Sequence, residues 1–489
     1  MIERSLYLAG RWVRGSGEPL RVYDPSTEDA IALVDTPSQD QIDTAVRRAS
    51  EVANELRRTP GTVRAGWLRK AADSLKDAHG SMAALEAQNV GKPLPEARLD
   101  VDDAIACLQY FADLAESMDH EQQRVIAQPL PHFSVSVRHE PVGVSALIIP
   151  WNFPLLTTMW KLAPAVAAGC PCIVKPSEFT PLSALAFAEL IRDCGLPDGA
   201  VSILCGLGAS VGEPLCRHPL VKKISFTGSS ATGRHVAAIA GAQLKRLTIE
   251  AGGKSALIVF ADTPVDVAVE WILFGGLYNQ GQVCNATTRV LIEESLYPEV
   301  LERVVREVSR LVIGPPGQDG VQMGPLQNRP QYEKFLRYVA LGQAAGARLL
   351  CGGDRHPAHR IGLFVRPAVF DQVSTTAQIW REEVFGPLLA FRPFRSEDQA
   401  IDAANDSPYG LAAAVLTADS ARADRVAAAM EAGCVWQNCN GLAFVQAPWG
   451  GVKDSGVGRE LGRWGLESFQ EVKQITRYSG VKPWGWYLK

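Results

Sequence analysis

Cys284 is the residue of this sequence best suited to act as a nucleophile. It lies in the segment QGQVCNATTR, residues 280–289, whose small and polar neighbours leave backbone amides free to approach a bound molecule. A thiolate is the best nucleophile that a side chain offers. A buried structural thiol is the alternative, because cysteine behaves as a small apolar residue in most cores. Chemistry at Cys284 therefore needs partners elsewhere in the chain.

Three other side chains could be those partners. Glu250 follows the apolar run 247–249 and could supply a carboxylate that activates a thiol or a water. Asn152, in the segment PWNFP, could donate a side-chain N–H to an oxyanion. Glu383, in the segment EEVFGP, could hold the ribose hydroxyls of a nicotinamide nucleotide. Taken singly, each has a simpler interpretation as a turn residue, a loop carboxylate or a surface charge.

The composition is that of an ordinary globular protein. The 489 residues are 47% hydrophobic and 21% charged, with a net charge of −4, so nothing favours nucleic acid or an anionic membrane as partner. No apolar stretch reaches the about 20 residues that span a bilayer, and residues 1–10 lack the apolar run of a secretory signal. We therefore expect a soluble, cytoplasmic protein. The ten cysteines should be reduced thiols, and Cys170 and Cys172 lack the second pair of a zinc site, so no metal is expected.

The elements that must position these side chains follow from hydrophobic periodicity. Residues 40–120 are expected to be helical, because apolar residues such as Ile42, Ala45 and Ala49 recur at helical spacing. From about residue 135 short apolar strands alternate with helices. The predicted strands are 142–149, 171–174, 200–204 and 223–226, and the predicted helices are 163–168, 184–194, 211–216 and 232–240. This alternation predicts a doubly wound parallel sheet of the nucleotide-binding kind.

A second α/β stretch is expected from about residue 253 to residue 440. Its suggested strands are 256–260, 289–292 and 433–437. The segments 126–140 and 473–487 alternate in strand fashion but stand apart from both units. They could pair as a small sheet used in assembly.

Eight segments resemble, in order along the chain, the signature segments of the aldehyde dehydrogenase superfamily. They are PWNFP (150–154), KPSE (175–178), FTGS (226–229), EAGGK (250–254), GQVC (281–284), EVFGP (383–387), NDSPYGL (405–411) and PWGGVKDSG (448–456). So many motifs in the right order make chance a negligible explanation, and the resemblance covers essentially the whole chain.

The resemblance implies an α/β fold with a doubly wound NAD-binding domain, a second α/β catalytic domain and a small β oligomerisation arm. We expect the NAD-binding domain at 1–125 and 147–252, with a return at 441–470. The catalytic domain is expected at 253–440, and the oligomerisation strands at 126–146 and 471–489. Members of the superfamily assemble as homodimers or homotetramers, and the sequence does not choose between them.

The resemblance also implies a mechanism. Cys284 would attack the carbonyl carbon of an aldehyde, with the oxyanion held between Asn152 and the Cys284 backbone N–H. Hydride transfer would leave a thioester, and Glu250 would act as general base for the water that hydrolyses it. Glu250 also argues against the branch of the superfamily that releases an acyl-CoA, because that branch lacks this carboxylate. The implied catalytic residues are Cys284, Glu250, Asn152 and Lys175.

For the cofactor, the superfamily does not use a GxGxxG loop, and this sequence has no convincing copy of one. Gly228 and Ser229 open a helix whose N-terminus suits a pyrophosphate. Lys175 and Glu178 match the positions that grip the adenine ribose, where a carboxylate would repel a 2′-phosphate, so NAD is favoured over NADP. The residues implied to bind NAD are Ile149, Pro150, Trp151, Asn152, Lys175, Ser177, Glu178, Gly208, Phe226, Gly228, Ser229, Glu250, Gly252, Glu383 and Phe385.

Within the superfamily the sequence is most similar to plant-type betaine-aldehyde and aminoaldehyde dehydrogenases. Four residues match an aromatic box in their substrate tunnel: Phe153, Trp160, Tyr278 and Trp449. Aromatic faces attract cations by about 0.5–2 kcal/mol per ring, so an ω-aminoaldehyde is expected as substrate, with betaine aldehyde second. Two positions depart from the subfamily, since Phe153 replaces a tyrosine and Tyr278 a tryptophan.

Three further residues are implied near the substrate. Asp100 and Asp103 match acidic positions at the tunnel entrance and share a helix face, although a solvated helix surface is the simpler interpretation. Cys434 lies behind the box, where a small residue is associated with room for a trimethylammonium group. A dehydrogenase for neutral aliphatic or aromatic aldehydes is the alternative within the enzyme class. A binding or structural protein on the same scaffold is the alternative outside it, and the presence of Cys284, Glu250 and Asn152 argues against that.

Overall fold

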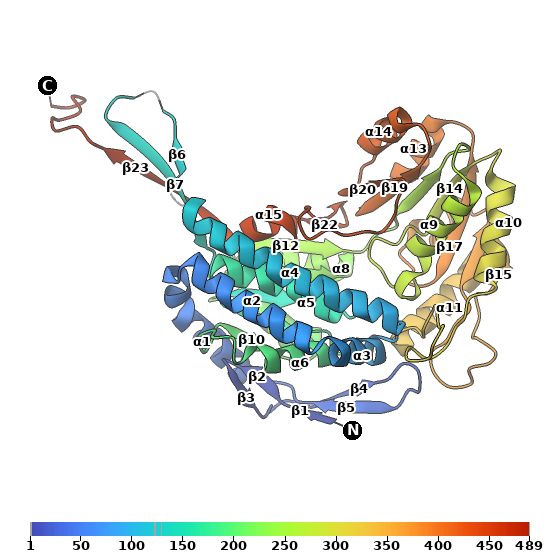
Figure 1. Ribbon diagram of the computed structural model, residues 1–489, viewed down its shortest axis with the longest axis horizontal. Coiled ribbons are helices and arrows are strands. Elements are labelled where there is room, and N and C mark those ends of the chain that lie inside the picture. Colours follow the sequence, from blue (N-terminus) through green and yellow to red (C-terminus); the bar gives the residue numbers. More distant parts are fainter. Residues whose placement is uncertain (1, 122–123, 129, 489) are drawn as a thin grey trace.

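The computed structural model describes residues 2–121, 124–128 and 130–488. Residues 1, 122, 123, 129 and 489, which fall within the expected NAD-binding domain and oligomerisation strands, lie outside the described residues. Figure 1 shows two α/β layers side by side, with a narrow β arm that extends away from them and carries the C-terminus. Among the described residues, no helix combines the length and the apolar character needed to cross a bilayer.

An eight-stranded sheet forms the first layer, in the order β22-β12-β11-β8-β9-β10-β2-β3. Its strands are β2 (Leu6–Leu8), β3 (Arg11–Val13), β8 (Ser145–Ile148), β9 (Cys172–Lys175), β10 (Val201–Ile203), β11 (Lys223–Gly228), β12 (Arg246–Ala251) and β22 (Gly456–Val457). The five central strands are parallel. Among these parallel strands, the chain passes first through β8 in the middle and then outward through β9 and β10. It returns to β11 on the other side of β8. This confirms the doubly wound prediction and places its switch point between β8 and β11.

Helices cover both faces of this sheet. They are α1 (Gln39–Arg58), α2 (Gly61–Asp77), α3 (His79–Val90), α4 (Leu94–Glu121), α5 (Pro154–Ala168), α6 (Leu182–Ile191), α7 (Glu213–Arg217) and α8 (Ser230–Ala242). Successive strand residues point to opposite faces. Ala146 packs with α1, α7 and α8, whereas Leu147 packs with α2, α4, α5 and α6. The apolar runs of these strands are therefore buried on both sides.

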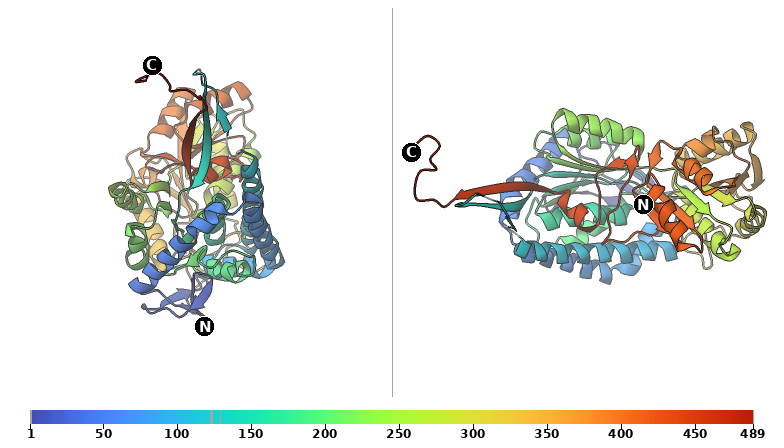
Figure 2. Two further views of the ribbon diagram at one scale, coloured as in Figure 1. Left: turned by 90° about the vertical axis from the view of Figure 1, so that its left-hand side faces the viewer. Right: turned by 90° about the horizontal axis from the view of Figure 1, so that it is seen from above.

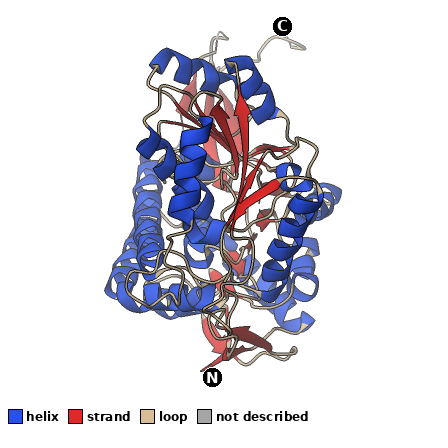
Figure 3. Cartoon of the chain, turned by 90° about the vertical axis from the view of Figure 1, so that its right-hand side faces the viewer, coloured by secondary structure: helices blue, strands red, loops and turns tan. Residues whose placement is uncertain are grey.

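A seven-stranded sheet forms the second layer, in the order β15-β16-β17-β14-β13-β19-β20. Its strands are β13 (Ala256–Val259), β14 (Arg289–Glu293), β15 (Arg348–Cys351), β16 (Ala368–Asp371), β17 (Leu388–Phe394), β19 (Ala412–Leu416) and β20 (Cys434–Gln437). Its helices are α9 (Val265–Leu277), α10 (Tyr297–Val308), α11 (Arg329–Ala344), α12 (Gln378–Arg381), α13 (Glu397–Asn405) and α14 (Ser420–Ala429). Figure 3 shows these helices on both sides of the strands. The four residues 252–255 join β12 of the first sheet to β13 of the second.

The arm is a three-stranded antiparallel sheet, β23-β7-β6. Strand β7 (Phe133–Pro141) pairs with β23 (Gln470–Tyr478) over nine residues, and with β6 (Arg124–Ile126) on its other edge. Figure 2 shows that this sheet projects beyond the helical layers. The prediction that the two outlying segments pair is confirmed. The predicted extension of the second strand to residue 487 is wrong, because β23 ends at Tyr478. The segment that follows it, which includes Pro483 and Gly485, has no strand partner among the described residues.

Smaller elements complete the chain. They are β1 (Ile2–Arg4), β4 (Leu20–Tyr23), β5 (Ala30–Val34), β18 (Tyr409–Gly410), β21 (Val452–Lys453), α15 (Gly462–Glu467), a π turn at Gly208–Gly212 and a 3-10 turn at Tyr278–Gly281.

Two predicted helix starts are wrong. Helix α5 begins at Pro154 rather than at residue 163, because proline suits a first helical position and this helix is buried on nearly every side, which hides its periodicity. The helix expected at 211–216 begins as the π turn and becomes α-helical only at Glu213.

Candidate active site

A single cavity of about 720 Å³ gathers almost every residue that the sequence singled out. Its lining includes Cys284, Glu250, Asn152 and Lys175. It also includes all of the implied cofactor residues and six of the seven implied substrate residues. Cys434 is the exception. The lining comes from the carboxyl ends of the strands of the first sheet and from the loops that precede β14 and β17 of the second. A molecule in this cavity therefore contacts both sheets.

The first sheet supplies a nucleotide-binding edge. Residues 149–152 follow β8, and Ser229 follows β11, so both lie at the switch point where open α/β sheets bind ligands. Ser229 is the N-cap of α8, and its Oγ accepts a hydrogen bond from the Thr232 backbone N–H at 3.3 Å. The first turn of α8 thus presents backbone N–H groups and a positive dipole end to the cavity. The helix begins at Ser230, two residues before the predicted start.

Lys175 and Glu178 lie on the same edge, where β9 ends. The Lys175 Nζ is 3.3 Å from Glu178 Oε2, and the lysine is buried while the carboxylate remains partly exposed. A carboxylate in this position can accept hydrogen bonds from ribose hydroxyls.

The nucleophile sits at the end of a strained loop. Asn279 and Gln280 have φ values of 48° and 59°, and Gly281 has 68°, so three successive residues before Cys284 adopt left-handed conformations. Such conformations are costly for residues other than glycine and persist only where the surroundings enforce them. Here the Gln280 and Gln282 side chains accept hydrogen bonds from the backbone N–H groups of Gly324 and Gln327, at 3.2 and 3.0 Å. Buried amide contacts therefore fix the loop.

Asn152 faces the nucleophile loop. Its Nδ2 donates a hydrogen bond to the Gln282 carbonyl oxygen at 2.9 Å, and its own carbonyl accepts one from Asn279 Nδ2 at 3.0 Å. A side-chain amide nitrogen carries two donors, and only one of those of Asn152 has an acceptor among the described residues. The second N–H could therefore serve an acceptor bound in the cavity, as an oxyanion donor would.

Burial and like charges raise the pKa of both the thiol and the carboxylate. The pKa of the Cys284 thiol is raised to about 12, first by burial and then by the nearby Glu250 and Glu383 carboxylates. Burial also raises the pKa of Glu250 well above its ordinary value, with the Glu460 carboxylate adding to the effect. Neither Glu250 oxygen has a hydrogen-bond partner in the described part of the chain. Glu250 is therefore a strong base held without a fixed donor next to the thiol.

Glu383 is partly buried in the cavity wall rather than a freely exposed surface charge. Its Oε1 accepts a hydrogen bond from the Gly253 backbone N–H at 3.2 Å. Both carboxylate oxygens lie so close to Gly252 that a Cβ atom there would be 2.2 Å from each. Trp151 and Phe385 meet edge to face beside it, with ring centroids 5.1 Å apart. Glycine at position 252 is thus required by the close approach of this carboxylate.

The aromatic residues gather at the other end of the cavity. Phe153 and Tyr278 lie nearly parallel with ring centroids 6.3 Å apart, and Trp160 meets Trp449 edge to face at 5.4 Å. All four line the cavity. The expected aromatic box is therefore assembled from α5, the loop after α9 and the chain near residue 449.

The structure gives Asp100 a partner that the sequence did not suggest. Asp100 is buried, and its carboxylate binds the buried ammonium of Lys92. Lys92 Nζ also lies 3.8 Å from the centroid of the Phe153 ring. Asp103 lies on the surface of the same helix, where it lines the mouth of the cavity. Partial removal from water there, followed by the nearby Asp100 and Asp102 charges, raises its pKa to about 6. A cationic substrate would therefore meet Asp103, because the charge of Asp100 is already matched.

Cys434 is not among the residues that line the cavity. It begins β20, which pairs with β19, and Glu250 and Gly450 are among its neighbours.

Several lining and supporting residues escaped the sequence analysis. They are Asn279, Gln280, Gln282, Gln327, Gln331, Lys334 and Glu460. The Gln331 Nε2 donates to the carbonyl oxygens of Val384 and Phe385, at 3.0 and 2.7 Å, and so holds the loop that carries Glu383. Glutamines in loops carry no periodic signal, although the run QGQ directly before Cys284 was visible in the sequence.

Fold and site together are those of an α/β enzyme in which a cysteine thiol and a carboxylate line one cavity with the switch-point edge of a doubly wound sheet. The model of the aldehyde dehydrogenase family matches residues 12–475. A chloroplastic aminoaldehyde dehydrogenase of Arabidopsis thaliana is 44% identical over 100% of this chain and 98% of its own length. A chloroplastic betaine aldehyde dehydrogenase of Amaranthus hypochondriacus is 43% identical over 99% of this chain and 98% of its own.

Solved structures agree with this match. The structure of betaine aldehyde dehydrogenase from Staphylococcus aureus, in complex with NAD+, superposes with a TM-score of 0.96 at 34% identity, over 100% of this chain and 97% of that one. The chain belongs to the aldehyde dehydrogenase family, which confirms the assignment made from the motifs.

Proposed function

We propose that this protein uses NAD to oxidise a cationic aldehyde, an ω-aminoaldehyde or betaine aldehyde, to its carboxylic acid. The observation that carries the proposal is the single cavity that joins Cys284 and Glu250 to an aromatic box at one end and a nucleotide-binding edge at the other. The relatives named above are aminoaldehyde and betaine aldehyde dehydrogenases, and the solved one binds NAD+.

The nucleotide-binding edge fits NAD. The N-terminus of α8 suits a pyrophosphate, Glu178 suits the adenine ribose, and Glu383 suits the nicotinamide ribose. Bound NAD would accept the hydride that leaves the aldehyde carbon. Asn152 and Cys284 lie between this edge and the aromatic box, where that carbon must be.

The side chains of the protein perform the remaining steps. Glu250 takes the proton of the Cys284 thiol, and the sulfur then bonds to the aldehyde carbon. The Asn152 side-chain N–H and the Cys284 backbone N–H stabilise the negative charge on oxygen. After hydride loss the carbon is held as a thioester. Glu250 releases the thiol proton to solvent and then removes a proton from water, the water oxygen bonds to the carbon and the C–S bond breaks. The proton on Glu250 then passes to the sulfur, so that the acid leaves with the thiol restored.

The aromatic box supports a cationic substrate, and Asp103 adds a negative charge at its edge. The Lys92 ammonium against Phe153 is the observation that favours the second candidate, a neutral aldehyde, because a cation already lies close to that ring. The two candidates differ only in the substrate.

The test is the rate of NADH formation with NAD and a matched panel of aldehydes. The panel pairs 3-aminopropanal, 4-aminobutanal and betaine aldehyde with propanal, butanal and benzaldehyde, with Cys284→Ala as control. Higher kcat/KM on the cationic aldehydes supports the proposal. Equal or higher values on neutral aldehydes of the same length would reject the cationic substrate and leave the reaction class intact.

Three further predictions belong with this function. The NAD-binding domain would comprise residues 1–125, 147–252 and 441–470, and the catalytic domain with the nucleophile would comprise residues 253–440. The contacts of a homodimer or homotetramer would be made by residues 126–146 and 471–489. A cytoplasmic location also stays a prediction, and the two plant relatives are both described as chloroplastic.

A further inference from the structure

Ser455 is a fully buried serine that lies between the short strands β21 and β22. Its Oγ accepts a hydrogen bond from the Gly410 backbone N–H of β18 at 3.0 Å, and it donates one to the Gly252 carbonyl oxygen at 2.8 Å. An amide N–H can only donate, so the single hydroxyl proton of Ser455 must point to the Gly252 carbonyl. The direction of both hydrogen bonds is therefore fixed.

The peptide group between Gly252 and Gly253 is hydrogen-bonded at both ends. Its carbonyl accepts from Ser455, and its N–H donates to Glu383 Oε1 at 3.2 Å. The two ends belong to one planar unit, so the orientation of the carbonyl sets the orientation of the N–H. Donation to the carbonyl also polarises the amide and strengthens its N–H as a donor. The hydroxyl of Ser455 thus acts on the contact with Glu383 through a single peptide group.

This peptide group needs such a contact because a glycine lies on each side of it. A Cβ atom at Gly252 would be 2.2 Å from each carboxylate oxygen of Glu383, and one at Gly253 would be 2.8 Å from the Cys284 carbonyl oxygen. Close approach therefore excludes a side chain at both positions. Glycine has wide backbone freedom, so a peptide between two glycines can turn its N–H away from the carboxylate at little steric cost. The hydrogen bond from Ser455 opposes that rotation.

Ser455 itself is held in place by its backbone and its packing. Its carbonyl oxygen accepts a hydrogen bond from the Ala251 N–H at 2.8 Å, and its own N–H donates to the Val452 carbonyl oxygen at 3.1 Å. A Cβ atom at Gly451 would be 2.5 Å from the Ser455 Cβ, so the side chain has close neighbours as well. The hydroxyl is therefore presented to the peptide group from a fixed turn.

We propose that Ser455 is a positioning residue for Glu383. Its hydroxyl holds the peptide group between Gly252 and Gly253 with the N–H toward the carboxylate, so that the carboxylate stays in place to accept hydrogen bonds from the nicotinamide ribose. The inference rests on the proposed function, because it takes Glu383 as the group that binds this ribose.

The test compares the affinity of NAD with that of ADP, which lacks the nicotinamide ribose, by isothermal titration calorimetry on the full-length protein and its variants. Ser455→Ala removes the hydroxyl and keeps the Cβ atom. NAD binding is expected to weaken about three- to tenfold, as the loss of one hydrogen bond predicts. ADP binding is expected to stay unchanged, because ADP lacks the ribose that Glu383 would bind.

Ser255→Ala is the matched control. The Ser255 hydroxyl is also buried and has no hydrogen-bond partner among the described residues, and its Oγ lies 3.3 Å from the position that a Cβ atom of Gly253 would take. The same substitution beside the same peptide group should leave both affinities unchanged.

A double-mutant cycle shows whether the effect passes through Glu383. In the Glu383→Gln background, Ser455→Ala should weaken NAD binding no further. An unchanged NAD affinity in Ser455→Ala, equal weakening of NAD and ADP, or an effect additive to that of Glu383→Gln would overturn the proposal. If Ser455→Ala does not fold, Ser455→Cys, whose thiol is a weak donor, takes its place in the same cycle. Failure of the wild-type protein to bind NAD, or an unchanged NAD affinity in Glu383→Gln alone, would instead contradict the proposed function.

Discussion

At the scale of single residues, the site combines a partly exposed thiol, Cys284, with a buried carboxylate, Glu250, whose charge acts on it. Burial raises the pKa of both Cys284 and Glu250. Each group disfavours ionisation of the other, because a thiolate and a carboxylate would be like charges in a cavity of low polarity. Deprotonation of the thiol therefore depends on what enters the cavity.

The reactivity of Cys284 in the cofactor-free protein should follow its raised pKa. At neutral pH the thiolate is a minute fraction, so alkylation by iodoacetamide should be slow and should accelerate about tenfold per pH unit between about pH 7 and about pH 10. Mass spectrometry of the peptide that contains Cys284 measures the rate, and Cys284→Ala identifies any signal from the other cysteines. A rate that is flat between about pH 7 and about pH 9 would mean that the thiol is already ionised.

Asn152→Ala should lower kcat and leave KM for the aldehyde nearly unchanged. Loss of one oxyanion donor typically lowers kcat by about 10²–10³-fold. Steady-state kinetics on the preferred aldehyde measures this change. Asn285→Ala is the control, because Asn285 lines the same cavity but its Nδ2 is 3.5 Å from the Gly441 carbonyl oxygen. A similar loss in both variants would argue against a special role for Asn152.

Asp103→Asn should lower kcat/KM for 3-aminopropanal by about 2–5-fold and leave propanal unaffected, because a partly exposed charge acts weakly through water. Asp102 is adjacent, exposed and paired with His79 at 3.0 Å, and it does not line the cavity. Asp102→Asn should therefore change neither substrate. An equal effect of the two substitutions would mean that Asp103 is only part of a solvated helix face.

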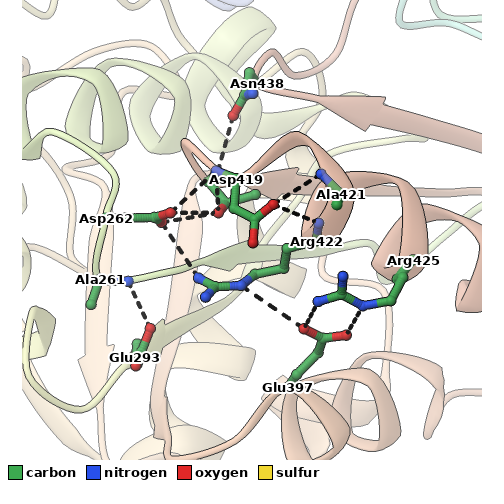
Figure 4. Close-up of polar contacts among 10 residues, drawn as sticks. Ala261, Asp262, Glu293, Glu397, Asp419, Ala421, Arg422, Arg425 and Asn438 are labelled. Carbon is green, nitrogen blue, oxygen red and sulfur yellow. Dashed lines mark hydrogen bonds and ion pairs between the residues drawn. The ribbon is translucent and has the colours of Figure 1, made fainter.

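At the scale of elements, a polar network ties the ends of two strands of the second sheet together (Figure 4). Asp262, just after β13, accepts hydrogen bonds from Thr417 Oγ1 at 3.0 and 2.9 Å and from the Asp419 backbone N–H at 3.2 Å. Asp419 in turn caps α14. Arg425 and Glu397 form an exposed pair beside it, at 2.9 Å.

The two parts of this network should differ in their contribution to stability. Asp262→Ala removes the acceptor of the Thr417 hydroxyl and one of the two acceptors of the Asp419 N–H, whose other acceptor is Thr417 Oγ1 at 3.2 Å. It should cost about 1 kcal/mol, which corresponds to a Tm about 2 °C lower. Arg425→Ala removes an exposed ion pair and should change the Tm by less than about 1 °C. Thermal unfolding followed by circular dichroism compares the two. The reverse order would show that the surface pair stabilises the sheet more than the buried hydroxyl contact.

The elements also show what the sequence could predict and what it could not. The parallel sheets followed from the βαβ alternation, and the site residues from motifs that lie at strand ends and in the loops before strands. Asn279 and Gln280 were missed because their left-handed conformations come from contacts with residues far away in the chain. The partner of Asp100 was missed because Lys92 lies before α4, outside the spacing of helical neighbours. The place of Cys434 behind the box stays a prediction, and nothing in its type revealed that β20 would hold it beside β19.

At the scale of the whole molecule, the arm has two open strand edges and apolar side chains in water. Val125 is 72% exposed and Val472 65% exposed. Unpaired edges of this kind favour association with another chain. We expect Val472→Glu to weaken the assembly, and light scattering after size-exclusion chromatography would show a lower mass. Leu244→Glu changes a residue that is 94% exposed in the turn between α8 and β12, and this substitution should leave the mass unchanged. If the wild-type protein and both variants had the same mass, Val472 of the arm would not contribute to oligomerisation.

The order in which the chain leaves the ribosome gives the pairing of β12 with β22 a further meaning. Glu250 of β12 lies opposite Gly456, and β7 pairs with β23. Strand β12 therefore lacks its edge partner, and the arm lacks one of its strands, until residues 456–478 have been synthesised. A chain that stops early would keep Cys284 and both layers but would leave β12 as an open edge. Residues 456–478 must therefore be synthesised before the protein can have a complete active site, and chains terminated before residue 456 should be inactive and prone to aggregate.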